Sequence, residues 1–164
     1  MDQAMTLLIV EDEPEILELL AENLSLLNVK LLTATNGQEA LSVMESNPDV
    51  TAIISDINMP VMSGIECLQK LRDRGIETPV IFLTAYTERQ KLSNAIRLGA
   101  YDFLDKPCGI SQLIQKAKHA LKFGLLLSDM KREFEDIFKK YGVSIEDQQK
   151  IRSLQRDTIS AKIA

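Results

Sequence analysis

The chain has 164 residues, of which 45% are hydrophobic and 26% are charged, a balance typical of a folded globular protein. No apolar run approaches the roughly 20 residues of a membrane span, and the first residues lack the basic and apolar regions of a signal peptide. Cys67 and Cys108 form no C-x-x-C pair, which argues against a disulfide framework or a zinc knuckle. We therefore expect a cytoplasmic protein that does not enter the membrane.

Charge is distributed unevenly along the chain. Residues 1–60 contain 11 acids and one base, whereas residues 61–164 contain 13 acids and 18 bases, for a net charge of -5. An acidic first third repels nucleic-acid phosphates and suits a cation. Residues 124–164 carry 7 acids and 8 bases, which is too balanced for a basic nucleic-acid arm. We therefore predict no direct binding to nucleic acid.

Five short β-rich apolar runs alternate with helical patterns over the first 105 residues. The runs lie at 6–10, 29–34, 50–55, 79–83 and 100–104. Four of them are almost continuously apolar or β-branched, which is typical of strands covered on both faces of a parallel sheet. The stretches between them carry amphipathic spacing and capping residues, such as Asn36 with Glu39. These patterns predict a doubly wound α/β sandwich with a five-stranded parallel sheet.

The chain after Pro107 has no proline, so it can be largely helical. Its positions at 4-3-4-3 spacing form an apolar seam with one polar member, namely Leu113, Ala117, Ala120, Gly124, Leu127, Lys131, Phe134, Phe138 and Tyr141. Two interpretations remain open: the helix runs past the sandwich and pairs with a partner, or it folds back on its own domain. Gly142 predicts a stop, and Ser144 with Asp147 predicts a last helix. We expect one domain at 1–123 and a helical extension at 124–164.

Polar residues follow four of the five predicted strands. The first strand runs into Glu11 and Asp12, the third into Asp56, the fourth into Thr84 and the fifth into Lys106. The carboxyl ends of parallel strands share one edge, so these groups face a single crevice, although Asp12 taken alone could simply cap a helix. Adjacent carboxylates repel one another unless a cation lies among them, and an all-oxygen donor set favours Mg²⁺. Mg²⁺ and a lysine beside a carboxylate are what phosphoryl transfer to that carboxylate requires.

Four segments of the chain carry a family resemblance. Their order and spacing resemble the receiver domain of two-component response regulators, of the chemotaxis-regulator type, over about residues 5–123. The segments are LLIVEDEP (7–14), IISDINMPVMSGIE (53–66), VIFLTAY (80–86) and AYDFLDKP (100–107). The resemblance implies a flavodoxin-like fold with strand order 2-1-3-4-5. It also implies Mg²⁺-dependent phosphoryl transfer from a histidine kinase or phosphotransfer protein to Asp56, and therefore a signalling switch rather than an enzyme.

The same resemblance implies roles for the acidic residues. Asp12 and Asp56 would bind Mg²⁺ directly, together with the backbone carbonyl of Asn58, and Glu11 would act mainly through bound water. Asn58 is also at a position that tunes hydrolysis of the acyl phosphate in the family. The family commonly has aspartate at the position of Glu11, and glutamate keeps the charge on a longer side chain.

The resemblance further implies a conformational switch. Thr84 would contact one phosphoryl oxygen and Lys106 another. Phe103, where the family more often has tyrosine, would turn inward as part of the switch. Alternatively, Phe103 is a plain core residue. The bond between Lys106 and Pro107 is cis in the family. Tyr86 occupies a second position that tunes hydrolysis, and we hypothesise that its bulk impedes the attacking water, so that Tyr86→Ala shortens the phosphoryl half-life.

Two other chemistries fit less well. Hydrolases of the haloacid dehalogenase group also form an aspartyl phosphate, but they place Asp-x-Asp after the first strand, whereas Asp56 follows the third. A flavodoxin needs a phosphate-cradling loop after the first strand, where the acidic EDEP would repel phosphate.

The output remains open. Residues 124–164 show no helix-turn-helix with a basic reading face and no enzyme motif. In one interpretation the chain is a stand-alone regulator that forms a phosphorylation-dependent homodimer through the fifth helix and tail. Equally, the chain is the front of a larger effector, such as a cyclic-di-GMP enzyme.

Overall fold

Alternating strands and helices organise the computed structural model, which describes residues 5–85 and 89–163, with side chains omitted at 89–90 and 155–163. Tyr86 therefore lies outside the described residues. The chain divides into two units, residues 1–127 and 128–164. None of the described helices combines the length and the apolar character that crossing a membrane requires.

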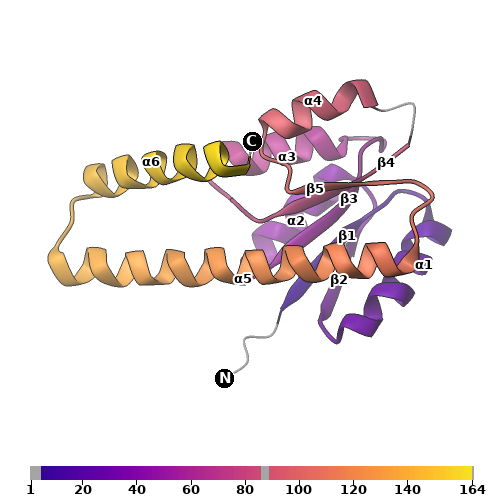
Figure 1. The fold of residues 1–164 in the computed structure, drawn as a ribbon, viewed down its shortest axis with the longest axis horizontal. Coiled ribbons are helices and arrows are strands. Elements are labelled where there is room, and N and C mark those ends of the chain that lie inside the picture. The colour runs from indigo at the N-terminus through magenta and orange to yellow at the C-terminus, as the bar shows by residue number, and fades with distance from the viewer. Residues whose placement is uncertain (1–4, 86–88, 164) are drawn as a thin grey trace. The chain divides into compact units, whose positions relative to one another are not determined.

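Five parallel strands form one sheet in the first unit (Figure 1). Their order is β2-β1-β3-β4-β5, as predicted. The strands are β1 (Thr6–Val10), β2 (Lys30–Ala34), β3 (Ala52–Asp56), β4 (Val80–Thr84) and β5 (Asp102–Asp105). Every residue of β1, β3 and β4 is buried, which explains their continuous apolar sequences. β5 begins two residues later than predicted, because the Ala100 N–H is still bound to the Ala95 carbonyl at the end of the preceding helix.

The helices lie between and after the strands, and several of them begin after a side chain that caps the first turn. They are α1 (Pro14–Leu24), the 3-10 turn η1 (Ser25–Leu27), α2 (Gly37–Ser46), α3 (Gly64–Asp73), α4 (Arg89–Arg97), α5 (Ile110–Tyr141) and α6 (Ile145–Ile163). The predicted cap of α2 is confirmed, because the Asn36 side chain accepts the Glu39 N–H at 2.9 Å. The Ser144 hydroxyl likewise accepts the Asp147 N–H at 3.1 Å before α6.

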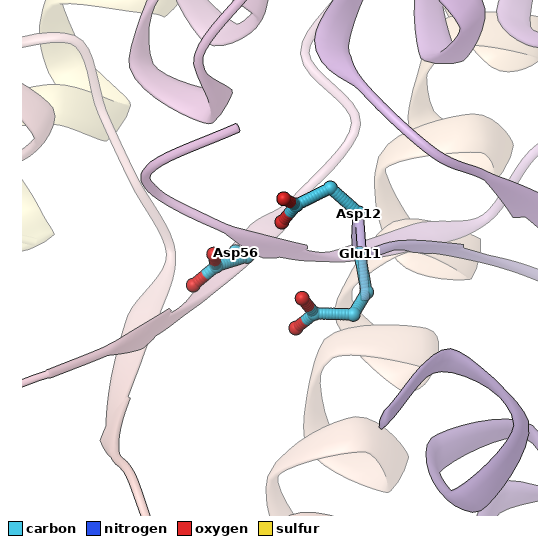
Figure 2. Close-up of side chains that lie close together, drawn as sticks. All are labelled: Glu11, Asp12 and Asp56. Carbon is cyan, nitrogen blue, oxygen red and sulfur yellow. The ribbon is translucent and has the colours of Figure 1, made fainter. Parts of the chain in front are cut away.

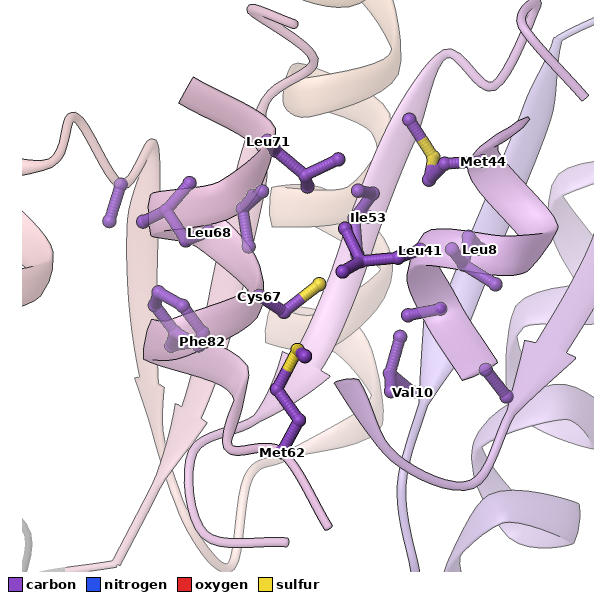
Figure 3. Packing of buried hydrophobic residues seen from close by; sticks show 14 of the residues in the cluster. Leu8, Val10, Leu41, Met44, Ile53, Met62, Cys67, Leu68, Leu71 and Phe82 are labelled. Carbon is purple, nitrogen blue, oxygen red and sulfur yellow. The ribbon is translucent and has the colours of Figure 1, made fainter. Parts of the chain in front are cut away.

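Two apolar clusters lie on the two faces of the sheet. The first joins the sheet to α2, α3 and α4 through residues such as Leu41, Leu68 and Phe82 (Figure 3). The second joins it to α1 and α5 through residues such as Leu24 and Leu113. Helices therefore cover both faces, as a doubly wound fold requires, and the strand ends are left to form a site.

Cys67 lies inside the first cluster (Figure 3). Burial raises the pKa of its thiol to about 11, so it packs as an apolar side chain and remains protonated at neutral pH.

The predicted seam of α5 has its first half inside the first unit. Leu113, Ala117 and Ala120 are buried in the cluster on the α1 side of the sheet. Gly124 is buried as well, and a Cβ atom there would lie 1.9 Å from the Thr51 carbonyl oxygen. At this position the helix backbone therefore lies so close to the start of β3 that only glycine, which has no Cβ atom, fits.

We expect Gly124→Ala to destabilise the first unit, because the added methyl group overlaps backbone that cannot move aside. The loss should be roughly 1–3 kcal/mol, the usual cost of overpacking, and should lower the thermal midpoint by several degrees, as followed by circular dichroism. Ser128→Ala is the matched control, since it adds alanine at an exposed position of the same helix and should leave the midpoint nearly unchanged. A Gly124→Ala midpoint equal to wild type would contradict the close approach.

Candidate functional site

Three carboxylates meet at the carboxyl edge of the sheet. β1 and β3 are parallel neighbours, with Val10 opposite Ser55. Glu11 and Asp12 follow β1, and Asp56 is the last residue of β3. Their side chains therefore lie close together (Figure 2). One oxygen from each carboxylate lies within 4.8 Å of the other two. The predicted clustering of strand ends thus brings Asp56 beside two residues that precede it by 44 and 45 positions in the chain.

Glu11 is the most deeply buried member of this cluster. Its side chain has no exposed surface, and one of its oxygens, Oε1, accepts the Glu13 N–H at 3.3 Å. Desolvation by burial raises the pKa of Glu11, and the nearby Lys106 offsets only part of that effect. The negative form of Glu11 therefore depends on a nearby cation.

Lys106 is the cation that the chain itself supplies. Its Nζ atom lies 3.0 Å from Glu11 Oε2 and 3.0 Å from Asp56 Oδ1. Burial lowers the pKa of Lys106, but the hydrogen bonds and charges of Asp56 and Glu11 outweigh it, so the pKa lies above its usual value. Lys106 therefore carries its positive charge throughout the neutral range.

The loop after β5 directs Lys106 into the pocket. The Lys106 N–H donates to the Thr84 carbonyl at 2.8 Å, which extends the pairing of β4 with β5 by one residue. The bond between Lys106 and Pro107 is cis, in agreement with the family pattern.

Thr84 lies beside the acidic cluster on the next strand. It is the last residue of β4 and has no exposed surface, and Asp56 pairs with the residue before it, Leu83. Its hydroxyl donates to the Ala85 carbonyl at 3.1 Å. A neutral carbonyl is a weaker acceptor than a phosphoryl oxygen, so this hydroxyl can exchange partners at low cost.

Phe103 lies on β5 opposite Phe82 of β4. Its half-buried ring stacks on the Phe82 ring, with centroids 6.1 Å apart. Phe103 thus packs against the cluster that contains α4, and its backbone N–H donates to Asp102 Oδ1 at 2.7 Å.

The loop after β3 brings two further residues close to Asp56. Asn58, two positions on, accepts a hydrogen bond from Lys91 of α4 through its side-chain oxygen. Gly64 begins α3 where a Cβ atom would lie 2.2 Å from the Asp56 carbonyl oxygen. Neither Lys91 nor Gly64 was among the site residues predicted from the sequence. The glycine at position 64 could have been noticed in the sequence, but nothing in the sequence links Lys91 to Asn58, which lies 33 positions away.

The donor chemistry of the pocket fits a hard divalent cation. Three carboxylates face one ammonium, so the pocket has excess negative charge, and its donors are oxygens throughout. Mg²⁺ prefers such oxygen ligands and commonly binds through one or two carboxylates.

Comparisons with known proteins agree on one family. The model of the response regulator receiver domain matches residues 7–118. Regulatory protein AtoC of Escherichia coli is 34% identical over 139 residues, which cover 84% of this chain and 29% of AtoC. A cyclic di-GMP phosphodiesterase of Thermotoga maritima is 35% identical over 118 residues, which cover 72% of this chain and 31% of that protein. The chain therefore spans less than a third of either curated relative.

A solved structure supports the same likeness. The crystal structure of a response regulator receiver domain protein from Clostridium thermocellum matches with a TM-score of 0.70 and 27% sequence identity. The match covers 75% of this chain and 98% of that one.

We expect Asp12→Asn to raise the thermal midpoint of the protein in EDTA, because it removes a charge that repels Glu11 and Asp56. The gain should be roughly 1 kcal/mol, or a few degrees. The same change should reduce the rise in midpoint that millimolar MgCl₂ gives the wild type, since a cation that binds only the folded state stabilises it. Differential scanning fluorimetry measures both.

The exposed Asp49 provides the control, and Asp49→Asn should preserve the magnesium response. A lower midpoint for Asp12→Asn in EDTA would show that the carboxylates do not repel one another in the folded protein.

Proposed function

The chain belongs to the response regulator receiver domain family, and from that membership we propose that Asp56 accepts a phosphoryl group from a histidine kinase or phosphotransfer protein. The observation that carries this proposal is the position of Asp56, buried beside Glu11 and Asp12 with its Oδ1 atom 3.0 Å from Lys106 Nζ. A carboxylate among acids and one lysine has the surroundings that phosphoryl transfer requires.

In the proposed reaction the Asp56 carboxylate is the nucleophile. One of its oxygens forms a bond to phosphorus, the phosphorus–nitrogen bond to the donor histidine breaks, and that electron pair returns to the imidazole. Asp12, Asp56 and the Asn58 backbone carbonyl would hold Mg²⁺ directly, and Glu11 would contribute through water. Bound Mg²⁺ would offset the charge on the phosphoryl oxygens.

Lys106 has a second part in this reaction. It already pairs with Glu11, whose buried side chain keeps the ammonium in place at 3.0 Å. The acyl phosphate removes the carboxylate charge of Asp56 and adds phosphoryl oxygens nearby. Lys106 can then pair with one of these oxygens and still remain bound to Glu11.

We propose that the switch follows from these new contacts. The Thr84 hydroxyl leaves the Ala85 carbonyl for a phosphoryl oxygen, and Phe103 adjusts its packing on Phe82. The energy logic is a shift between two populations, biased by contacts that only the phosphorylated state makes. In this account the protein is a signalling switch and not an enzyme for a separate substrate.

The tail offers a surface for a second copy of the chain. Beyond Gly124, α5 carries an apolar stripe at the 3-and-4 spacing of a coiled coil, formed by Leu127, Met130, Phe134, Ile137 and Tyr141. It differs from the predicted seam, which had Lys131 and Phe138 in place of Met130 and Ile137, because Phe138 is buried. Met130, Ile137 and Tyr141 are 38%, 47% and 69% exposed. We propose that phosphorylation promotes homodimerisation through this stripe.

A second candidate is a regulatory part of a longer effector. The relatives AtoC and the cyclic di-GMP phosphodiesterase each extend well beyond the matched region. On this proposal α5 and α6 join the receiver to an effector. In both candidates the chain acts in the cytoplasm, where the histidine kinase obtains the phosphoryl group from ATP. In both, the balanced charge of residues 124–164 argues against direct binding of nucleic acid by this segment.

Asp56→Asn should abolish labelling by acetyl phosphate in the presence of Mg²⁺, because an amide is not a nucleophile for phosphorus. Separation of the phosphorylated form on a phosphate-affinity gel measures the label. Asp49→Asn, which alters an exposed acid before β3, should label as the wild type does. Equal labelling of Asp56→Asn and wild type would mean that another residue is the acceptor.

Lys106→Ala should retain part of the labelling but lose the response to it. The variant keeps the Asp56 nucleophile but lacks the ammonium that pairs with Glu11 and with the phosphoryl group. Labelling and molecular mass measured on the same sample distinguish the two effects. A labelled Lys106→Ala protein that associates as fully as wild type would exclude this role.

Light scattering with and without beryllofluoride and Mg²⁺ tests the dimer. We expect the mass to double with the phosphoryl mimic and to remain single in Ile137→Glu, because a charge in the apolar stripe opposes pairing. Lys139→Glu changes the charge at an exposed neighbouring position outside the stripe, and it should still dimerise. An unchanged wild-type mass would favour the effector candidate.

A further inference from the structure

α4 makes a direct contact with the loop that carries the phosphoacceptor. The Lys91 ammonium donates to Oδ1 of Asn58, and Asn58 follows Asp56 by two residues. Both residues are exposed, so apolar packing does not fix the positions of their side chains. The contact is instead a specific hydrogen bond between two elements 33 residues apart in sequence.

We propose that Lys91 is a positioning residue that orients the Asn58 side chain and thereby prolongs the life of the phosphoryl group on Asp56. This inference rests on the proposed function, since it presupposes that Asp56 is phosphorylated. It adds a residue of α4 to the control of that group.

The contact determines which end of the amide points toward α4. An ammonium group donates hydrogen bonds and accepts none, so it can bind only the oxygen of an asparagine side chain. While Lys91 holds Oδ1, the Asn58 NH₂ group is the part of the amide directed away from Lys91, and that group donates but does not accept.

This orientation bears on the hydrolysis step. In hydrolysis a water oxygen forms a bond to phosphorus, and the phosphorus–oxygen bond to Asp56 breaks. The electron pair returns to the Asp56 carboxylate, and the proton of the water is carried away by the released phosphate. An acceptor near the attacking water orients it and assists removal of the proton. Lys91 holds the acceptor oxygen of Asn58 toward α4 and away from the attacking water, so the contact slows hydrolysis.

Solvent is available on this side of the loop. Lys91 and Ile57 both line an open surface cavity of about 420 Å³, together with Ser63 and Arg97. The side of the loop that Lys91 contacts is therefore open to water.

The test compares phosphoryl half-lives after removal of acetyl phosphate, read on a phosphate-affinity gel. Lys91→Met should shorten the half-life roughly threefold, the scale of the net free energy of one ordinary hydrogen bond. Lys91→Arg keeps a cationic donor and should restore most of the wild-type value. Lys70→Met, which removes an exposed lysine from α3, is the matched control and should have no effect.

The double variant distinguishes positioning from a merely structural role. If Lys91 acts through Asn58, Lys91→Met should produce no further change in an Asn58→Ala background. An equal threefold loss in that background, or an unchanged half-life in Lys91→Met alone, would overturn the inference. Failure of the wild type to label at all would instead overturn the proposed function, so the two failures are distinguishable.

Discussion

The ion pair between Glu11 and Lys106 is the constraint on which the rest of the site depends. A carboxylate with no exposed surface is strongly destabilising unless a cation accompanies it. The two residues are far apart in the sequence, since Glu11 follows β1 and Lys106 follows β5. They meet at 3.0 Å because all five strands run parallel and their carboxyl ends share an edge.

This ion pair also explains why the pocket is poised to accept charge. Lys106 is shared between Glu11 and Asp56, so neither carboxylate is fully compensated while Asp12 lies nearby. A site built in this way is less stable without a cation than an apolar core would be, but its carboxylate oxygens already lie close together, as binding of a divalent ion requires. Functional sites commonly lower stability in exchange for such preorganisation.

Most of the fold could be predicted from the sequence, because buried segments have recognisably apolar sequences. The continuous apolar strands predicted the parallel sheet, and the acids that follow them predicted the cluster. The seam of α5 was less informative, because spacings of three and four residues describe packing on a sheet and packing on another helix equally well. Gly124 packs against Thr51, so the seam serves the sheet up to that point. The Lys91–Asn58 bond was beyond prediction because it depends on the placement of α4.

A continuous set of contacts connects the site to α5. The Phe103 N–H binds Asp102 Oδ1 at 2.7 Å, and the other oxygen of Asp102 lies 2.6 Å from Lys116 Nζ on α5. Asp102 therefore joins the Phe103 backbone to Lys116. α5 is a single helix from Ile110 to Tyr141. β5 is thus joined by an ion pair to the helix that carries the exposed apolar stripe.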